Sequence, residues 1–252
     1  MKTAIISGGN GGLGRAMASG LQARGWHTVL LDINVDGLEE NALQTPVKVD
    51  LTDADDLARA AAVVLADRTS IDLVVYNAGV SAIAAFEDQS ETGHRRVFEI
   101  NYWAATAMAR TFLTALRQSQ GVHLAISSVA GFSPLYHRTA YAASKHAMQG
   151  FFTSLRSEEA CHGVRCLIAA PSFVATNLGA SQRTAEGLVR PGSAPDGVDY
   201  MTPAAAAEVI LKGLDKGQDF IPVGRIARLA YWVNRISPRL FEHLMRRNIK
   251  PE

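Results

Sequence analysis

Tyr141 and Lys145 are the residues of this chain whose types and spacing point most directly to chemistry. On a helix, positions i and i+4 lie on one face, so the phenol and the ammonium would be neighbours. A free phenol has a pKa of about 10 and is a poor base at neutral pH. A cation beside it stabilises the phenolate and lowers that pKa. The pair therefore predicts proton transfer to or from an alcohol or carbonyl, although a solvated helix face can show this spacing by chance.

Other polar residues lie near this pair. Ser128 stands thirteen residues before Tyr141, directly after a strand expected at residues 122–127. His137 and His146 flank the tyrosine and suggest a histidine base. Neither a Ser/His/Asp arrangement nor a G-x-S-x-G elbow accompanies them, so we interpret both histidines as surface or pocket-wall residues.

A glycine-rich loop near the start of the chain indicates a phosphate site. Residues 7–14 read SGGNGGLG, after an expected strand and at the start of an expected helix. Glycine lets the backbone turn tightly and approach a pyrophosphate, whose charge then meets the helix N-terminus. Asp32 follows eighteen positions after Gly14, at the end of the second expected strand. This order predicts a dinucleotide-binding half.

Asp32 also predicts which dinucleotide binds. A carboxylate can accept both ribose hydroxyls of NAD, but it would repel the 2′-phosphate of NADP at a cost of several kcal/mol. Users of NADP usually supply a nearby cation, whereas Gly9, Asn10, Gly11 and Ile33 are uncharged. The sequence therefore favours NAD over NADP.

Short β-rich runs alternate with longer helical patterns along the chain. We expect buried strands at residues 3–7, 28–32, 47–50, 73–76, 122–127 and 164–170, and an edge strand at 219–223. Helical periodicity covers residues 13–24, 54–68, 92–116 and 140–162. Such alternation predicts an α/β fold of the Rossmann type, a doubly wound parallel sheet of about seven strands with helices on both faces. Residues 1–252 are expected to form a single domain.

Two regions depart from the alternation. Residues 178–201 are rich in glycine and proline without a clear period, which is typical of a functional loop, and we expect a substrate lid there. Residues 225–250 carry six arginines and one lysine among apolar and aromatic residues. We expect either a C-terminal helical cover over the substrate pocket or an amphipathic segment that contacts an anionic membrane or a partner.

Composition excludes several classes of protein. The net charge of +1 does not suggest a polyanionic partner such as nucleic acid. The two cysteines, Cys161 and Cys166, cannot form a disulfide framework, and their spacing has no companion cluster that would indicate a metal site. There is no secretory signal and no apolar run of the roughly 20 residues that span a bilayer. We expect a cytoplasmic protein without a metal.

The motifs together resemble the short-chain dehydrogenase/reductase family from residue 2 to about residue 178. The glycine loop fits that family's T-G-x-x-x-G-x-G, with Ser7 in place of threonine. Asp50-Leu51 resembles the pair that contacts the adenine, and Asn77-Ala78-Gly79 resembles the N-N-A-G turn beneath the cofactor, with Tyr76 at its first position. Residues 171–176 resemble the P-G-x-x-x-T segment beside the nicotinamide, with Ser172 in place of glycine.

The resemblance implies four catalytic residues: Asn101, Ser128, Tyr141 and Lys145. Tyr141 would be the general base, Ser128 would hold the substrate oxygen, and Lys145 would lower the pKa of Tyr141 and hold the nicotinamide ribose. Asn101 would position a water molecule that links Lys145 to solvent. The cofactor contacts expected from the loop, the acidic residue and the resemblance are Gly8, Asn10, Gly11, Gly12, Leu13, Gly14, Asp32, Ile33, Asp50, Leu51, Asn77, Ala78, Gly79, Tyr141, Lys145, Pro171, Val174 and Thr176.

The expected function is hydride transfer between NAD and a secondary alcohol or ketone. Apolar residues in the expected pocket walls favour a lipophilic small molecule, and pairs of long helices suggest a homodimer or homotetramer. Two alternatives stay open: an NADPH-dependent carbonyl reductase of the same family, and a non-catalytic protein that binds a dinucleotide or a membrane surface. An isomerase or dehydratase is disfavoured because such chains usually carry a larger C-terminal substrate domain.

Overall fold

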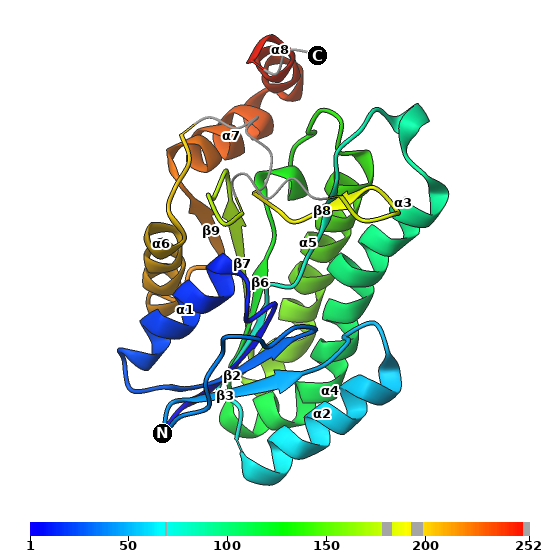
Figure 1. Ribbon diagram of the computed structural model, residues 1–252. Helices are drawn as coiled ribbons and strands as arrows, with labels where there is room; N and C mark the ends of the chain where they lie inside the picture. The colour runs from blue at the N-terminus through cyan, green and yellow to red at the C-terminus, as the bar shows by residue number, and fades with distance from the viewer. Residues whose placement is uncertain (69, 178–182, 193–198, 249–252) are drawn as a thin grey trace.

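Seven parallel strands form the central sheet of this computed structural model, in the order β3-β2-β1-β4-β6-β7-β9 (Figure 1). The structure describes residues 1–68, 70–177, 183–192 and 199–248. The strands are β1 Thr3–Ser7, β2 His27–Asp32, β3 Gln44–Lys48, β4 Leu73–Tyr76, β6 Val122–Ile126, β7 Arg165–Pro171 and β9 Phe220–Val223. A separate antiparallel pair joins β5 (Ser81–Ala82) to β8 (Leu188–Val189).

Helices cover both faces of the sheet (Figure 1). One face packs against α1 (Gly12–Gln22) and α6 (Pro203–Asp215), and the other against α2 (Ala54–Asp67), α4 (Ala104–Ser119) and α5 (Thr139–Glu159). Successive strand residues point to opposite faces, so Ile6 belongs to the first core and Ile5 to the second. Both side chains are fully buried. Burial on both faces explains why these strands are continuous apolar runs.

The predicted fold class is confirmed, and the topology shows where a site should form. The chain builds β1, β2 and β3 toward one edge, returns to place β4 beside β1, and then builds toward the other edge. In such sheets ligands bind outside the carboxyl ends of the strands where the order reverses. The glycine loop follows β1 and Asn77 follows β4, so both lie at this reversal. The expected edge strand at residues 219–223 is also confirmed, as β9.

The third strand lies earlier than the sequence predicted. The expected run was 47–50, whereas β3 spans Gln44–Lys48 and pairs with β2 from Thr28 opposite Gln44. This strand is at the edge of the sheet and only partly buried, so polar side chains are tolerated. Pro46 has no N–H to donate, and it is tolerated because an edge strand pairs on one side only. Apolar content was therefore the wrong signal at this position.

The long helix expected at residues 92–116 is interrupted. It consists of α3 (Glu91–Phe98), a π-helical turn at Glu99–Trp103, and α4. Ser90 caps the first segment by accepting a hydrogen bond from the Gly93 N–H at 3.0 Å. A π turn widens the helix by one residue and is common at functional sites. Asn101 lies inside this turn.

The C-terminal residues form two helices at one end of the molecule (Figure 1). Helix α7 spans Arg225–Ile236 and α8 spans Pro238–Asn248. Tyr231 of α7 packs against the rings of Phe132 and Phe220, and Asn234 donates a hydrogen bond to the Phe132 carbonyl. Helix α7 is thus fixed on the segment that precedes α5. Residues 249 and 250 of the expected cover lie outside the described residues, as do 178–182 and 193–198 of the expected lid.

A buried tyrosine–histidine pair lies between the sheet and α5. Tyr76 Oη and His123 Nδ1 are 2.6 Å apart, and Phe152 packs against both rings. Burial lowers the pKa of His123 to about 4 and raises the pKa of Tyr76 well above its ordinary value. Tyr76, which departs from the family pattern, therefore serves the core on the α5 side of the sheet.

This pair predicts a loss of stability in acid. An unfolded histidine, with a pKa of about 6.5, binds a proton that folded His123 does not accept until near pH 4. The free energy of unfolding therefore rises with pH through this window, by about 2 kcal/mol between pH 5 and pH 7. His123→Gln keeps an acceptor for Tyr76 and removes the titration. Urea midpoints measured at both pH values should differ less in this variant than in the wild type.

His243→Gln is the matched control, because it makes the same change at an exposed position on α8. Its midpoints should keep the wild-type dependence on pH. If His123→Gln kept that dependence too, the assignment of the acid sensitivity to His123 would be wrong.

Candidate functional site

A cleft of about 490 Å³ opens at the carboxyl ends of β1 and β4. Every predicted cofactor contact lines it except Gly14. A side chain at Gly14 would collide with the Gly8 carbonyl, so this glycine serves the close packing of α1 on the loop. Of the four predicted catalytic residues, Ser128, Tyr141 and Lys145 line the cleft, and Asn101 lies behind its wall.

The loop after β1 is tied to the loop after β4 by the side chains of Ser7 and Asn77. The Ser7 hydroxyl accepts the N–H groups of Asn77 and Ala78 at 2.9 and 3.1 Å. The Asn77 amide donates to the carbonyls of Ser7 and Gly8 at 3.0 and 3.1 Å. Serine in place of the family threonine therefore keeps the hydroxyl that this tie requires, and the tie sets the shape of the cleft floor.

The start of α1 faces this cleft as an anion-binding end. Gly11 caps the helix without a side-chain hydrogen bond, and the first turn carries no acidic residue. The first N–H groups of a helix lack internal partners and carry partial positive charge. Gly8 has a φ of +61°, and a side chain there would lie 3.0 Å from the Ala78 Cα. The backbone thus fits the close approach of a pyrophosphate.

Asp32 holds the edge of the glycine loop in place. Its carboxylate accepts the Asn10 N–H at 2.9 Å and the Asn34 N–H at 3.2 Å. Arg15 Nε donates to the side-chain oxygen of Asn10 at 2.8 Å and so fixes the same loop from outside. Asp32 lines the cleft beside Ile33, whose side chain is 61% exposed. The carboxylate is therefore positioned to accept further hydrogen bonds from a ligand.

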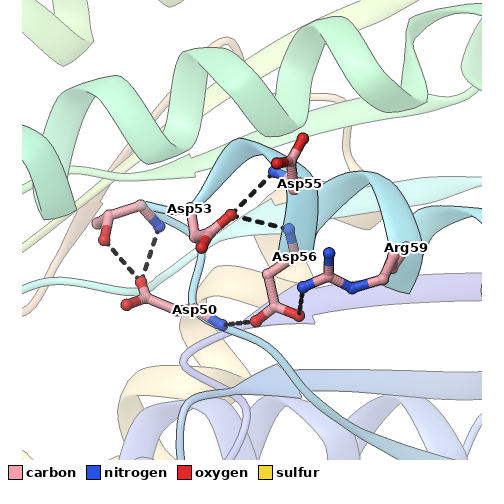
Figure 2. Close-up of polar contacts among 6 residues, drawn as sticks. Asp50, Asp53, Asp55, Asp56 and Arg59 are labelled. Atoms are coloured by element: carbon pink, nitrogen blue, oxygen red, sulfur yellow. Dashed lines mark hydrogen bonds and ion pairs between the residues drawn. The ribbon is translucent and has the colours of Figure 1, made fainter.

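Asp50 lies beside the start of α2 (Figure 2). Its Oδ1 accepts both the N–H and the hydroxyl of Thr52, at 2.9 and 2.7 Å, and its own N–H donates to Asp56 at 2.7 Å. Asp53 caps α2 by accepting the N–H groups of Asp55 and Asp56. Burial raises the pKa of Asp50, but the hydrogen bonds from Thr52 outweigh it and hold the pKa below its usual value. The ionised carboxylate is available at this end of the cleft.

Lys145 is buried next to Tyr141 on one face of α5, as the i, i+4 spacing predicted. Its Nζ lies 5.9 Å from the centre of the Tyr141 ring and donates to the Ile126 carbonyl at 2.8 Å. The side chain is only 4% exposed, and burial lowers its pKa to about 8. Lys145 thus brings a cation to the inner end of the cleft.

The expected pKa of Tyr141 is corrected by the structure. The sequence predicted that Lys145 lowers this pKa, whereas in the free protein burial raises it above the ordinary value. A hydrogen bond with Ser128 and the charge of Arg138 oppose the effect only in part. Desolvation disfavours the charged phenolate, and here it outweighs these two contributions.

Arg138 was missed by sequence reasoning. It lies three residues before Tyr141, is 7% exposed and lines the cleft. Its Nη1 donates to the Tyr136 carbonyl at 3.3 Å. The sequence did contain a signal for it, because Arg138 precedes Tyr141 by about one helical turn, just as Lys145 follows it by about one turn. Two cations therefore flank the phenol.

Asn101 connects the loop after β4 to α5 and is fully buried. Its amide accepts the Val80 N–H at 2.8 Å and donates to the Val80 carbonyl and to the Ser144 hydroxyl, at 2.9 and 3.0 Å. Ser144 in turn donates to the Tyr141 carbonyl at 2.8 Å. Both amide hydrogens are thus used within the protein, so the Asn101 side chain holds the loop after β4 against α5. Its role in positioning a water molecule stays a prediction.

The segment after β7 forms the wall opposite α1. A side chain at Gly12 would lie 3.2 Å from the Thr176 Cβ, so these two residues are in close contact. Ser172, which replaces the family glycine, donates to the Val223 carbonyl at 3.4 Å. A side chain at Gly224 would lie 2.9 Å from that hydroxyl. Glycine at position 224 therefore makes room for serine at position 172, and the wall keeps its path.

Comparison with known sequences identifies the group to which these features belong. A profile of the family described as short chain dehydrogenase matches residues 2–187. The Bos taurus protein named Dehydrogenase/reductase SDR family member 7B is 33% identical over 264 residues, covering 98% of this chain and 81% of the bovine one.

Solved structures give the same result for the fold. A short-chain dehydrogenase from Streptomyces avermitilis aligns with a TM-score of 0.83 and 26% identity, over 98% of this chain and 99% of that one. One from Burkholderia cenocepacia in complex with NADP aligns at 0.82 and 22%, over the whole of both chains. One from Burkholderia phymatum in complex with NAD aligns at 0.79 and 23%, over 100% and 97%. Proteins of this fold are thus found with NADP and with NAD.

Proposed function

The chain belongs to the short-chain dehydrogenase family, an oxidoreductase family that uses nicotinamide dinucleotides, and we propose that it transfers a hydride between NAD and a secondary alcohol or ketone. The observation that carries the proposal is that Ser128, Tyr141 and Lys145 line the same cleft as the glycine loop and Asp32. A protein that only binds a dinucleotide would not need this serine and tyrosine beside each other.

Tyr141 is proposed as the general base of alcohol oxidation. It takes the hydroxyl proton of the substrate, while Ser128 hydrogen-bonds the same oxygen and stabilises the charge that develops on it. NAD, when bound, supplies the positively charged nicotinamide that accepts the hydride. Lys145 would contact the nicotinamide ribose, and Asn101 keeps α5 in register with the loop after β4. Ketone reduction reverses these steps.

The raised pKa of Tyr141 in the free protein sets a requirement on this mechanism. A phenol with a pKa above 10 holds its proton at neutral pH. Opposite charge within a few ångströms favours the phenolate, and burial strengthens that attraction. Lys145 and Arg138 supply two of the charges, and the nicotinamide of NAD would supply a third. Tyr141 therefore becomes a competent base in the complex rather than in the free protein.

NAD is proposed over NADP because of Asp32. The carboxylate lines the cleft, with the uncharged Ile33 and Asn34 next to it. Its repulsion of a 2′-phosphate would not be offset by a cation from either neighbour. An NADPH-dependent carbonyl reductase, the second candidate, would need such a cation.

A lipophilic substrate is proposed from the apolar residues around Tyr141. Ile83, Ile100, Leu135 and Phe173 line the cleft. Apolar walls with a few polar groups are typical of small-molecule sites. The lid expected at residues 178–201 and the cover formed by α7 would complete this wall.

Self-association is proposed from an exposed aromatic face at the end of the π-helical turn that precedes α4. Trp103 is 52% exposed and packs edge to face with Tyr102, whose ring also contacts Phe151 of α5. Aromatic residues of this kind are enriched where proteins associate. We infer that a second copy covers this face in a homodimer or homotetramer.

Peripheral membrane contact is proposed from α7. Leu229, Trp232 and Ile236 recur at helical spacing and are 63%, 58% and 81% exposed, whereas Tyr231 packs inward. Residues 225–252 contain seven cationic residues and two glutamates, which gives this segment a net charge of +5 in a chain whose total is +1. An apolar stripe within a basic segment complements an anionic lipid surface. None of the described helices is long and apolar enough to cross a membrane. We propose that the contact is peripheral and that the protein is cytoplasmic.

Tyr141→Phe tests the proposed reaction. The change removes the proton acceptor and little volume, so turnover of secondary alcohols with NAD should fall by at least about 100-fold. NAD binding, measured by calorimetry, and NADH binding, measured by nicotinamide fluorescence, should remain near the wild-type values. Undiminished turnover would exclude Tyr141 as the base. A wild type that binds NAD but oxidises no member of a panel of lipophilic alcohols would favour the non-catalytic alternative.

Asp32→Asn tests the cofactor preference, because it removes the charge and keeps the shape and an acceptor oxygen. Dissociation constants for NADPH and NADH should be compared in the wild type and the variant. NADPH should bind the variant at least about tenfold more tightly, since like-charge repulsion is worth several kcal/mol. Asp36→Asn, in the same loop but outside the cleft lining, should change neither constant. A wild type that prefers NADPH would contradict the assignment.

Leu229→Gln with Trp232→Gln tests membrane contact. The wild type should sediment with vesicles containing phosphatidylserine, less with pure phosphatidylcholine, and less at high salt. The double variant should stay in solution.

Trp103→Gln is the control. It should still sediment with vesicles, and its oligomeric state in sedimentation velocity should be lower than that of the wild type. Equal sedimentation of the double variant and the wild type would exclude the α7 stripe as the lipid-binding surface.

A further inference from the structure

The chain on both sides of Arg190 is held against the cofactor cleft. Val189, in β8, pairs with Ser81 of β5, two residues after the turn formed by Asn77, Ala78 and Gly79. On the other side of Arg190, the carbonyl of Pro191 accepts hydrogen bonds from the side chains of Thr176 and Asn177 at 2.8 and 2.9 Å. Arg190 therefore has an anchored residue directly before it and another directly after it.

The second anchor places Arg190 close to the start of α1. A side chain at Gly192 would lie 2.6 Å from the Thr176 hydroxyl and would collide with the Val174 carbonyl. Thr176 in turn touches Gly12, the first residue of α1. The backbone from 190 to 192 therefore packs on the same segment that touches the first residue of α1.

Arg190 adds a positive charge to the lining of the cleft. Its side chain lines the cleft and is exposed. Within the described part of the chain, its guanidinium has no hydrogen-bond or ion-pair partner. The start of α1 faces the same cleft, with no acidic residue in its first turn and no side-chain cap. Two sources of positive potential, from segments far apart in the sequence, thus border one volume.

We propose that Arg190 is a direct contact of the cofactor pyrophosphate, reaching it from the segment between β8 and Gly192. A guanidinium offers paired donors that match two phosphate oxygens. Helix N–H groups and Arg190 would then both contact the phosphates. This inference rests on the proposed function, because it requires a dinucleotide in the cleft.

Arg190→Gln tests the contact without using activity. Dissociation constants for NADH and for ADP-ribose, which contains the pyrophosphate, should rise by about 10- to 100-fold, as expected for the loss of a hydrogen-bonded charge. Adenosine, which lacks the pyrophosphate, should bind the variant and the wild type equally. Arg190→Lys should recover part of the affinity. The dependence of NADH binding on salt should become shallower in Arg190→Gln.

Arg183→Gln is the matched control, since it removes an exposed arginine from the same segment outside the cleft lining. It should bind NADH and ADP-ribose as the wild type does. Unchanged affinity of Arg190→Gln for ADP-ribose, in a protein whose wild type binds it, would overturn the inference and leave the proposed function intact. A wild type that binds neither NADH nor ADP-ribose would instead contradict the proposed function.

Discussion

The buried ammonium group of Lys145 is the constraint on which the rest of the site depends. It is almost fully shielded from water and has one short hydrogen bond, to the Ile126 carbonyl at the end of β6. Burying a charge with so little compensation is costly, which is why its pKa falls to about 8. The cost is lowered when groups that favour a cation are brought beside it. A phenolate at Tyr141 and the hydroxyls of a ribose are such groups. The cost of burying the Lys145 charge therefore favours the complex with bound cofactor and an ionised Tyr141.

Three polar connections keep this arrangement in position. Asn101 ties the loop after β4 to Ser144, one residue before Lys145, and Ser144 closes on the Tyr141 carbonyl. Ser7 and Asn77 join the ends of β1 and β4 below the cofactor cleft. The connections between Asn101 and Ser144 and between Ser7 and Asn77 join segments far apart in the sequence, so the site exists only when the whole sheet is assembled. The glycine loop and the catalytic helix are thereby held in one frame.

The sequence predicted what depends on local pattern. Strand–helix alternation predicted the parallel sheet, and the i, i+4 spacing placed Tyr141 and Lys145 on one helix face. It could not predict quantities that depend on the surroundings of a side chain. The pKa of Tyr141 moves upward because partial burial disfavours the charged phenolate. Arg138 and Arg190 become relevant only because the fold brings them to the cleft. The strand at Gln44–Lys48 was misplaced because an edge position relaxes the need for apolar residues.

The central claim, that bound cofactor and nearby cations convert Tyr141 into a base, is tested most directly by titrating its phenolate. The ultraviolet absorbance of the wild type minus that of Tyr141→Phe reports this one phenol. Without NAD, its pKa should lie above the ordinary value of about 10. With saturating NAD it should fall below 10, toward neutrality. An unchanged pKa on NAD binding, with the phenol still protonated in the pH range of turnover, would contradict the account.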